Sequence, residues 1–173
     1  TDNNAMIIVP HLDTKQSSWG VAGQFDSQKA VEWSAAVTTG AAITTTGIWA
    51  GLKLTNTPVY ATDTDQIYFV YDATDDSGAF TTNANLHVVH SIGGTDRITN
   101  LGIAVAVNTT YHLHIKIAAD RTATVYVNGT QYSLTTASTA GGVLTGAGTV
   151  ASAALTTNKP LIPYIGVIAR AGS

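Results

Sequence analysis

The chain has 173 residues, of which 45% are hydrophobic and only 11% are charged, and its formal net charge is -3. This length suits one domain with a substantial core, and the charge excludes the basic footprint of a nucleic-acid-binding protein. No apolar run approaches the roughly 20 residues that span a bilayer, and the absence of cysteine excludes a disulfide framework and thiol chemistry.

Short segments rich in β-branched, aromatic or alternating residues follow one another along the chain, separated by turn residues. No segment has a helical period with caps. Strands at intervals of about 8–15 residues predict an all-β, two-sheet antiparallel β-sandwich. Residues 93–96 are expected to form a turn. The expected strands are, in chain order, residues 6–9, 19–25, 30–38, 47–54, 66–72, 86–92, 101–107, three strands within 111–134, and 161–169.

The clearest pattern lies in residues 111–134. Over 111–117, four apolar residues alternate with three polar ones, which is the period of a strand with one buried and one wet face. A polar turn at Asp120 separates this strand from a second alternating one. Asn128 and Gly129 then give a strong hairpin signal, because both residues tolerate positive φ. The segment therefore predicts a three-stranded meander.

This meander resembles the late strands of concanavalin A-like lectin/glucanase jelly rolls, including the laminin-G and pentraxin types. Those families show an aromatic-led strand, a turn around Asp or Gly, and a strand that ends in Val-Asn-Gly. Other segments resemble the branch of this fold found in bacteriophage virion proteins. They are residues 47–55, 65–72, 86–94, 99–105 and 161–167.

The resemblance covers residues 19–169 and implies a single jelly-roll domain over residues 1–173. Residues 1–18 are expected to form an N-terminal arm, and residues 135–158 a long irregular connection. The fold that the chain resembles has a further strand after the segment that matches 161–167. We therefore expect either that the C-terminus is truncated or that another segment or another subunit closes that sheet edge.

Carboxylate chemistry is restricted by the single glutamate, Glu32. The glucanases of this fold carry a Glu-x-Asp-x-x-Glu strand, in which acid and nucleophile lie about 5–5.5 Å apart. Glu32 has no second carboxylate beside it, so we expect it on the solvent face of its strand. The sequence therefore predicts a protein that is not an enzyme.

Aspartates gather between residues 63 and 76. Calcium takes six to eight oxygen ligands, and laminin-G-like domains place Asp-rich loops at a sandwich rim. Solvated turn residues are the alternative interpretation, since Asp favours turns. No cofactor is expected unless these residues bind calcium. The candidate ligands are Asp63, Asp65, Asp72, Asp75 and Asp76.

Two histidines, His112 and His114, share one face of a strand and suit a metal, but no third ligand is visible at the right spacing. Polar residues on the wet face of a strand explain them equally well. His87 and His90 are expected on opposite faces of their strand.

Aromatic residues supply the candidate binding surface. Trp49 is out of phase with the apolar residues of its strand, so it is expected on the other sheet face, in a groove or against a partner. Tyr68 and Tyr71 are expected to extend this amphipathic surface. Stacking on sugars and contact with a protein partner both remain open for Trp49, Tyr68 and Tyr71.

Three functions follow from these observations. The first is a structural protein of a bacteriophage virion, a capsid-decorating or fibre-associated jelly roll that forms homo-oligomers and binds other virion proteins, with no nucleic acid and no membrane as partner. The second is a carbohydrate-binding, lectin-like module or phage adhesin. The third is a glycoside hydrolase or lyase that uses an aspartate pair.

Overall fold

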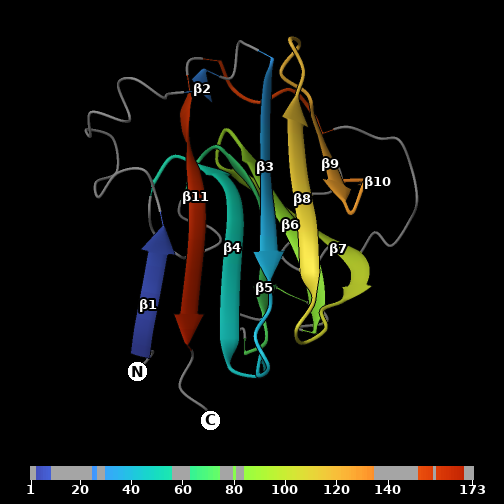
Figure 1. Ribbon diagram of the computed structural model, residues 1–173. Coiled ribbons are helices and arrows are strands. Elements are labelled where there is room, and N and C mark those ends of the chain that lie inside the picture. The colour runs from blue at the N-terminus through green and yellow to red at the C-terminus, as the bar shows by residue number, and fades with distance from the viewer. Residues whose placement is uncertain are drawn as a thin grey trace.

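The computed structural model describes residues 3–8, 25–26, 30–55, 63–74, 80, 84–134, 152–157 and 159–169 (Figure 1). Within these residues the chain is all β, as predicted from the sequence, and none of them forms a helix long and apolar enough to cross a membrane. The described strands are β1 (Asn3–Ile8), β2 (Phe25–Asp26), β3 (Val31–Thr38), β4 (Thr46–Lys53), β5 (Gln66–Asp72), β6 (Asn85–Ile92), β7 (Thr95–Ala104), β8 (Thr110–Ile117), β9 (Ala123–Val127), β10 (Thr130–Tyr132) and β11 (Pro160–Ala169).

The strands form two antiparallel sheets that pack as a sandwich, which confirms the predicted fold class. The larger sheet has the order β1-β11-β4-β5-β6-β7, with β2 paired to β11, and the smaller sheet has the order β10-β9-β8-β3. Figure 1 views the molecule with the smaller sheet in front of the larger one.

The main core lies between the two sheets. On the smaller sheet, alternation turns Trp33, Ile115 and Val125 inward, while their neighbours along each strand face solvent. Ile67 and Phe69 of β5 meet them from the larger sheet. Each fully buried side chain of this size contributes roughly 1.5–3 kcal/mol through removal of apolar surface from water.

A second apolar cluster covers the opposite face of the larger sheet. Every residue of β5 is buried, so this strand has no wet face. Strands that are buried on both faces read as continuous apolar runs rather than as alternating ones. The members of the second cluster are Trp49, Tyr68, Val70, Phe80, Val89, Ile98, Tyr164 and Ile168.

Strand β7 differs from its prediction. It begins at Thr95, inside the expected turn, and ends at Ala104 rather than at residue 107. Gly93 and Gly94, with φ of 59° and 82°, complete the turn by themselves, so pairing resumes at once between Ile92 and Thr95. The turn is therefore two residues shorter than the polar sequence suggested.

The sheet edge beside residues 161–167 is closed by another segment of the chain, which is one of the alternatives that the sequence left open. Strand β11 lies inside the larger sheet, with β4 on one side and β1 on the other. Ile8 pairs with Ile165 in this arrangement. The partner comes from the other end of the chain, and strand pairing between such distant segments is not readable from local pattern.

The meander of β8, β9 and β10 is confirmed. Asn128 and Gly129 adopt φ of 51° and 80°, as the predicted hairpin requires, and the Asn128 side chain accepts a hydrogen bond from the His112 backbone N–H at 2.9 Å. Residues 152–157 pack on the β8–β9 end of the sheet without forming a strand. Of the other expected elements, residues 19–24, 135–151 and 158 lie outside the described residues.

Candidate functional site

The three aromatic residues expected at a binding surface are buried. Trp49, Tyr68 and Tyr71 are 2%, 0% and 4% exposed. Trp49 does point away from the main core, but the face that it reaches is the second apolar cluster and not open solvent. Tyr71 lies in the main core, where its hydroxyl donates to the Ile43 carbonyl at 3.1 Å and burial raises its pKa. These residues therefore do not form the exposed surface that the sequence predicted.

Three of the five candidate calcium ligands are buried rather than solvated. Asp63 accepts hydrogen bonds from two backbone N–H groups, those of Leu54 at 2.8 Å and Thr55 at 2.9 Å, and from the Thr55 hydroxyl at 2.6 Å. Its oxygens thus already have protein donors. Neither interpretation of Asp63, as a wet turn residue or as a free calcium ligand, matches this environment.

Asp65 and Asp72 are also held by the protein. The Asp65 carboxylate accepts from the Gly93 N–H at 3.3 Å and lies 3.6 Å from the Lys159 ammonium. Asp72 accepts from the Thr74 N–H at 3.4 Å. Across the described part of the chain, no three His, Asp or Glu side chains gather closely enough to hold a metal ion. The remaining candidates, Asp75 and Asp76, lie outside the described residues.

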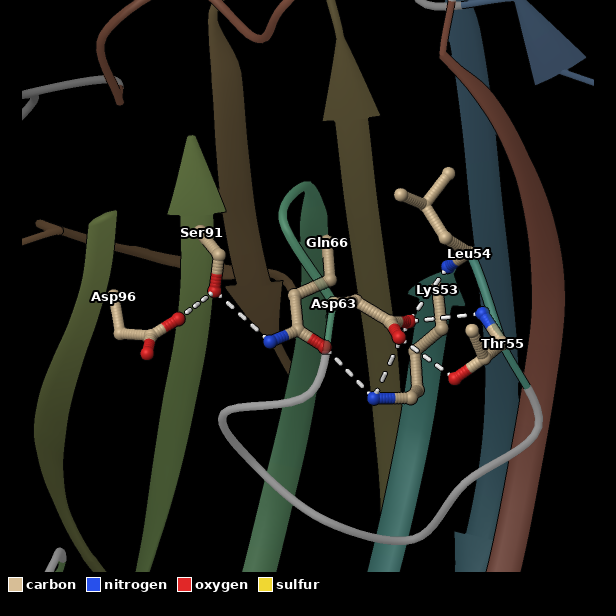
Figure 2. Close-up of polar contacts among 7 residues, drawn as sticks. All are labelled: Lys53, Leu54, Thr55, Asp63, Gln66, Ser91 and Asp96. Atoms are coloured by element: carbon tan, nitrogen blue, oxygen red, sulfur yellow. Dashed lines mark hydrogen bonds and ion pairs between the residues drawn. The ribbon is translucent and has the colours of Figure 1, made fainter. Parts of the chain in front are cut away.

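A row of polar side chains crosses the larger sheet on the face of the second cluster. We call Lys53, Gln66, Ser91 and Asp96 the buried row; the first three are buried, Asp96 at the end is half-buried, and they come from β4, β5, β6 and β7 (Figure 2). Gln66 lies directly opposite Ser91, and Ser91 lies opposite Asp96. The row is thus one rung of the sheet.

Hydrogen bonds run along the buried row in one direction. The Lys53 Nζ donates to Gln66 Oε1 at 2.7 Å, and Gln66 Nε2 donates to Ser91 Oγ at 2.9 Å. Ser91 Oγ in turn donates to an Asp96 carboxylate oxygen. Each polar group in the row is therefore satisfied by its neighbour, which is what a buried network needs to stabilise a sheet.

Lys53 is the charged end of the buried row. Its ammonium lies 3.6 Å from Asp63, with both side chains 0% exposed, and 4.6 Å from the centroid of the Tyr68 ring. Burial lowers the Lys53 pKa, and the attraction of Asp63 opposes that shift. Because Lys53, Gln66 and Ser91 are buried and bonded to one another, the row suits fixing strand register rather than recognition of a ligand.

The histidines of β6 face opposite sides of the sheet, as predicted. His87 belongs to the outer face, and its Nδ1 shares a hydrogen bond with the Asn85 carbonyl at 2.9 Å. His90 turns toward the main core, where neither ring nitrogen has a hydrogen-bond partner among the described residues. Burial, with a smaller contribution from Arg97, lowers the His90 pKa to about 4.

The smaller sheet has an exposed polar face, on which a groove of about 670 Å³ runs over β3 and β8. Its outward side chains pair across the two strands, Glu32 with Lys116 and Ser34 with His114. We call it the β3–β8 groove. It is lined by Glu32, Ser34 and Ala36 of β3, by His112, His114 and Lys116 of β8, and by Tyr126 of β9.

Ionic and ring contacts hold the side chains of the β3–β8 groove in place. Glu32 lies 3.2 Å from the Lys116 ammonium and 3.6 Å from the His114 imidazole. The His114 ring stacks on the Tyr126 ring, with centroids 5.2 Å apart and planes inclined by 24°. Glu32 lies on the solvent face, as predicted, and the groove offers donors, acceptors and an aromatic wall to solvent.

Part of this site was readable from sequence. Alternation placed His112, His114 and Lys116 on one wet strand face, and the same pattern in the next strand placed Tyr126 on that face. The pairing of β3 with β8 could not be predicted from the sequence. Thr38 and Thr110, which pair across the two strands, are 72 positions apart, and no local pattern spans that distance. None of the groove residues belonged to the predicted binding site, which was placed at Trp49, Tyr68 and Tyr71.

A scan against protein-family models finds no match to this chain, and a search of the curated proteins finds none either. The function is accordingly argued from the surfaces that the sandwich presents, since a fold alone does not define a function.

Proposed function

We propose that this chain is a non-enzymatic structural protein of a bacteriophage virion, a capsid-decorating or fibre-associated, concanavalin A-like jelly roll that binds other virion proteins and further copies of itself. The sequence resemblance to virion proteins of this fold supports the proposal, and so does a surface with few charges. The structural observation that carries it is the edge of β3, which pairs with β8 alone among the described strands.

Strand β3 is an edge strand without the usual protection. Among the described strands it pairs only with β8, and it runs for eight residues without Pro or Gly. Glu32 is its single charged residue. An edge strand of this length and low charge is a template for pairing with a strand of another chain.

The opposite edge of the sandwich makes a contrast. Strand β7 carries Asp96 and Arg97, and its pairing with β6 shifts register at Leu86 and His87. Gly102, with φ of 69°, lies at this irregularity. Charges and bulges are devices that discourage pairing with another chain, so β3 is the edge better suited to assembly.

The number and placement of the carboxylates favour a binding function over a catalytic one. Glycoside hydrolysis needs a pair of them across the scissile bond. Glu32 is the only glutamate of the chain, and its oxygens already face Lys116 and His114. No aspartate lines the β3–β8 groove among the described residues.

The experiment is particle association. Phage particles from the bacterium that carries the gene are purified on a density gradient and probed with an antibody against the chain. Purified recombinant chain is then added to particles that lack it. We expect the chain to sediment with particles and to bind them again when added.

Two matched variants locate the contact. Ala36→Lys places a charge on the β3 edge and is expected to weaken particle binding several-fold, whereas Tyr126→Ala changes the same sheet face away from the edge and is expected to leave particle binding unchanged. A chain that is absent from particles in every gradient fraction would overturn the proposal.

A further inference from the structure

The backbone groups of β8 show which way the groups of the edge strand β3 point. Along a strand, the N–H and C=O groups of successive residues point alternately to the two sides. The Asn128 N–H donates to the His112 C=O at 2.8 Å, and the Ala118 N–H donates to the Thr122 C=O at 2.8 Å. The even-numbered residues of β8 therefore bond to β9, and the odd-numbered ones face β3.

The strand register extends this alternation to β3. Odd-numbered residues of the two strands lie opposite each other, as Ala35 does with Leu113, so the odd-numbered residues of β3 bond to β8. The Thr39 N–H, which donates to the Thr109 C=O at 3.0 Å, follows the same rule. The even-numbered residues consequently point their N–H and C=O groups at the open edge, where no described strand pairs with them. They are Glu32, Ser34, Ala36 and Thr38.

The main core is incompletely covered along this edge. Val31, Ala35 and Val37 of β3 pack against the core but are only half-buried. The residues opposite them on β8, which are Ile117, Leu113 and Tyr111, are all buried. The difference marks the β3 edge as the place where another strand would remove further apolar surface from water.

The larger sheet extends past β3 and presents apolar side chains there. In Figure 1, β11 and β1 lie beyond β3, and no described strand of the smaller sheet lies in front of them. Ile48 and Ile165 pack against the main core, yet both are half-buried. Val167 lies opposite Ile48 in the ladder, hence on the same face, and is half-buried too. We call Ile48, Ile165 and Val167 the apolar shelf.

A small cavity lies between β3 and the apolar shelf. Its volume is about 20 Å³, and its lining includes Val37 and Ile48. A space of roughly 10–15 Å³ already holds a water-sized sphere, but apolar walls give water no hydrogen-bond partner. The cavity therefore suits a methyl-sized part of an apolar side chain that enters from the edge.

These features define the occupant as a single extended segment. A strand added to β3 points alternate side chains at the shelf, so it needs apolar residues at alternate positions. Glu32, the only charge on β3, favours a basic residue opposite it. A second copy of this chain cannot bring its own β3 to this edge, because its larger sheet would occupy the layer that β11 and β1 already fill.

We propose that the β3 edge and the apolar shelf take up one extended segment of a neighbouring virion protein, which adds a fifth strand to the four-stranded smaller sheet. Main-chain hydrogen bonds supply the affinity, and the shelf selects the apolar residues of the segment. The inference rests on the proposed function for the source of the segment, and it names the form of partner that the edge accepts.

The test is amide hydrogen exchange of the isotope-labelled full chain, followed by NMR. The probe is a synthetic peptide of about nine residues, alternately Val and Thr, with Lys at one end. In the free chain, the amides of Glu32, Ser34 and Ala36 should exchange rapidly, and the bound peptide should slow them by about tenfold or more. The amides of Trp33 and Ala35, which bond to β8, should exchange slowly in both states.

Matched variants assign the binding to the edge and the shelf. Ala36→Pro removes an N–H that faces the edge and that the β3–β8 ladder does not use, so it should weaken peptide binding by about tenfold or more. Ser34→Ala keeps the N–H and should retain binding. Val167→Lys charges the shelf and should weaken binding as Ala36→Pro does. Thermal unfolding checks that each variant is folded.

A control peptide tests the alternation. It has the same composition with its Val residues consecutive, and it should bind about tenfold more weakly or worse. The inference is overturned by unchanged exchange at the even-numbered amides of β3, by equal binding of the two peptides, or by parental binding in Ala36→Pro. Slow exchange of the same amides in the concentrated free chain would also overturn it, since a second copy would then occupy the edge.

Phage particles separate this inference from the proposed function. Particle binding by Ala36→Pro at the parental level would overturn the inference and leave the proposed function standing. Peptide binding by a chain that never joins phage particles would uphold the edge as a strand acceptor and overturn the proposed function.

Discussion

The buried row of the larger sheet and the β3–β8 groove of the smaller sheet contain the same chemistry in opposite surroundings. Lys53 lies 3.6 Å from Asp63 with both side chains 0% exposed, and Lys116 lies 3.2 Å from Glu32 with exposures of 52% and 60%. The distances are similar. The difference in solvent access decides what each pair does.

Burial makes the first pair a structural element. Taking a lysine out of water disfavours its charged form, which is why the Lys53 pKa is lowered, and the neighbouring Asp63 and Gln66 compensate that cost. The second pair stays solvated, so its charges have little desolvation penalty and remain accessible. A ligand can reach Glu32 and Lys116, whereas none can reach Lys53 without opening the sheet.

Removal of one partner from each pair should give the largest contrast. We expect Lys53→Met to lower the free energy of unfolding by about 3–5 kcal/mol, because it leaves the Asp63 charge buried without its partner. Lys116→Met should cost less than about 1 kcal/mol, since its pair is exposed. Urea denaturation of both variants measures the difference, and equal losses would contradict the comparison.

The pH dependence of His90 protonation is a second test of the contrast between buried and exposed groups. The His90 pKa is lowered from 6.5 to about 4, so the unfolded chain takes up a proton more readily than the folded one. His90 therefore does not reduce the free energy of unfolding above pH 6.5. As the pH falls from 6.5 toward 4, it lowers the free energy of unfolding by about 3 kcal/mol in total.

The measurement for His90 is urea denaturation at a series of pH values. In His90→Leu, the part of the acid sensitivity between pH 6.5 and 4 that belongs to this residue should disappear. Val107→Ala, which changes an exposed residue that does not titrate, is the control for the substitution itself and should leave the profile close to that of the parent chain. An identical profile for His90→Leu and the parent chain would refute the prediction.

The centre of the buried row should be less sensitive than its charged end. Ser91→Ala removes the hydroxyl that links Gln66 to Asp96, and an unsatisfied buried group costs about 1–3 kcal/mol. Ser34→Ala, on the exposed face of β3, should stay within about 0.5 kcal/mol of the parent chain. Thermal unfolding followed by circular dichroism compares the two, and a larger effect at Ser34 would reverse the assignment.

The smallest expected effect on stability is that of Glu32→Gln. It removes the charge that faces Lys116 and His114, yet both partners remain solvated, so the free energy of unfolding should fall by less than about 1 kcal/mol. Urea denaturation measures the change, and a loss of stability as large as that of Lys53→Met would contradict the comparison.

The sequence was most informative where a strand has one wet face. Alternation in residues 111–117 predicts both the strand and the sides of its histidines correctly, because polar and apolar positions are sorted by solvent. In β4 and β5 both faces are buried, so the alternation of residue types along the strand no longer indicates which side chains are exposed. Trp49 was therefore assigned to the correct face but to the wrong environment.

Buried polar groups were the second feature that could not be predicted from the sequence. Gln66 and Ser91 read as surface residues by type, and only the rung formed by four strands satisfies them inside the sheet. The groove depends likewise on the pairing of β3 with β8, which joins segments far apart in sequence. The pairing of strands that are far apart in the sequence determines the residues that meet in both regions, and a local sequence pattern does not indicate that pairing.

The most direct test of the account is a lysine-labelling footprint of the folded chain by mass spectrometry. We expect Lys116, whose side chain is 52% exposed, to react with an amine reagent, while Lys53, which is 0% exposed, stays unreactive. Labelling of Lys53 in the folded chain, or a Lys116 that does not react, would contradict the assignment of the first pair to structure and of the second pair to the accessible surface.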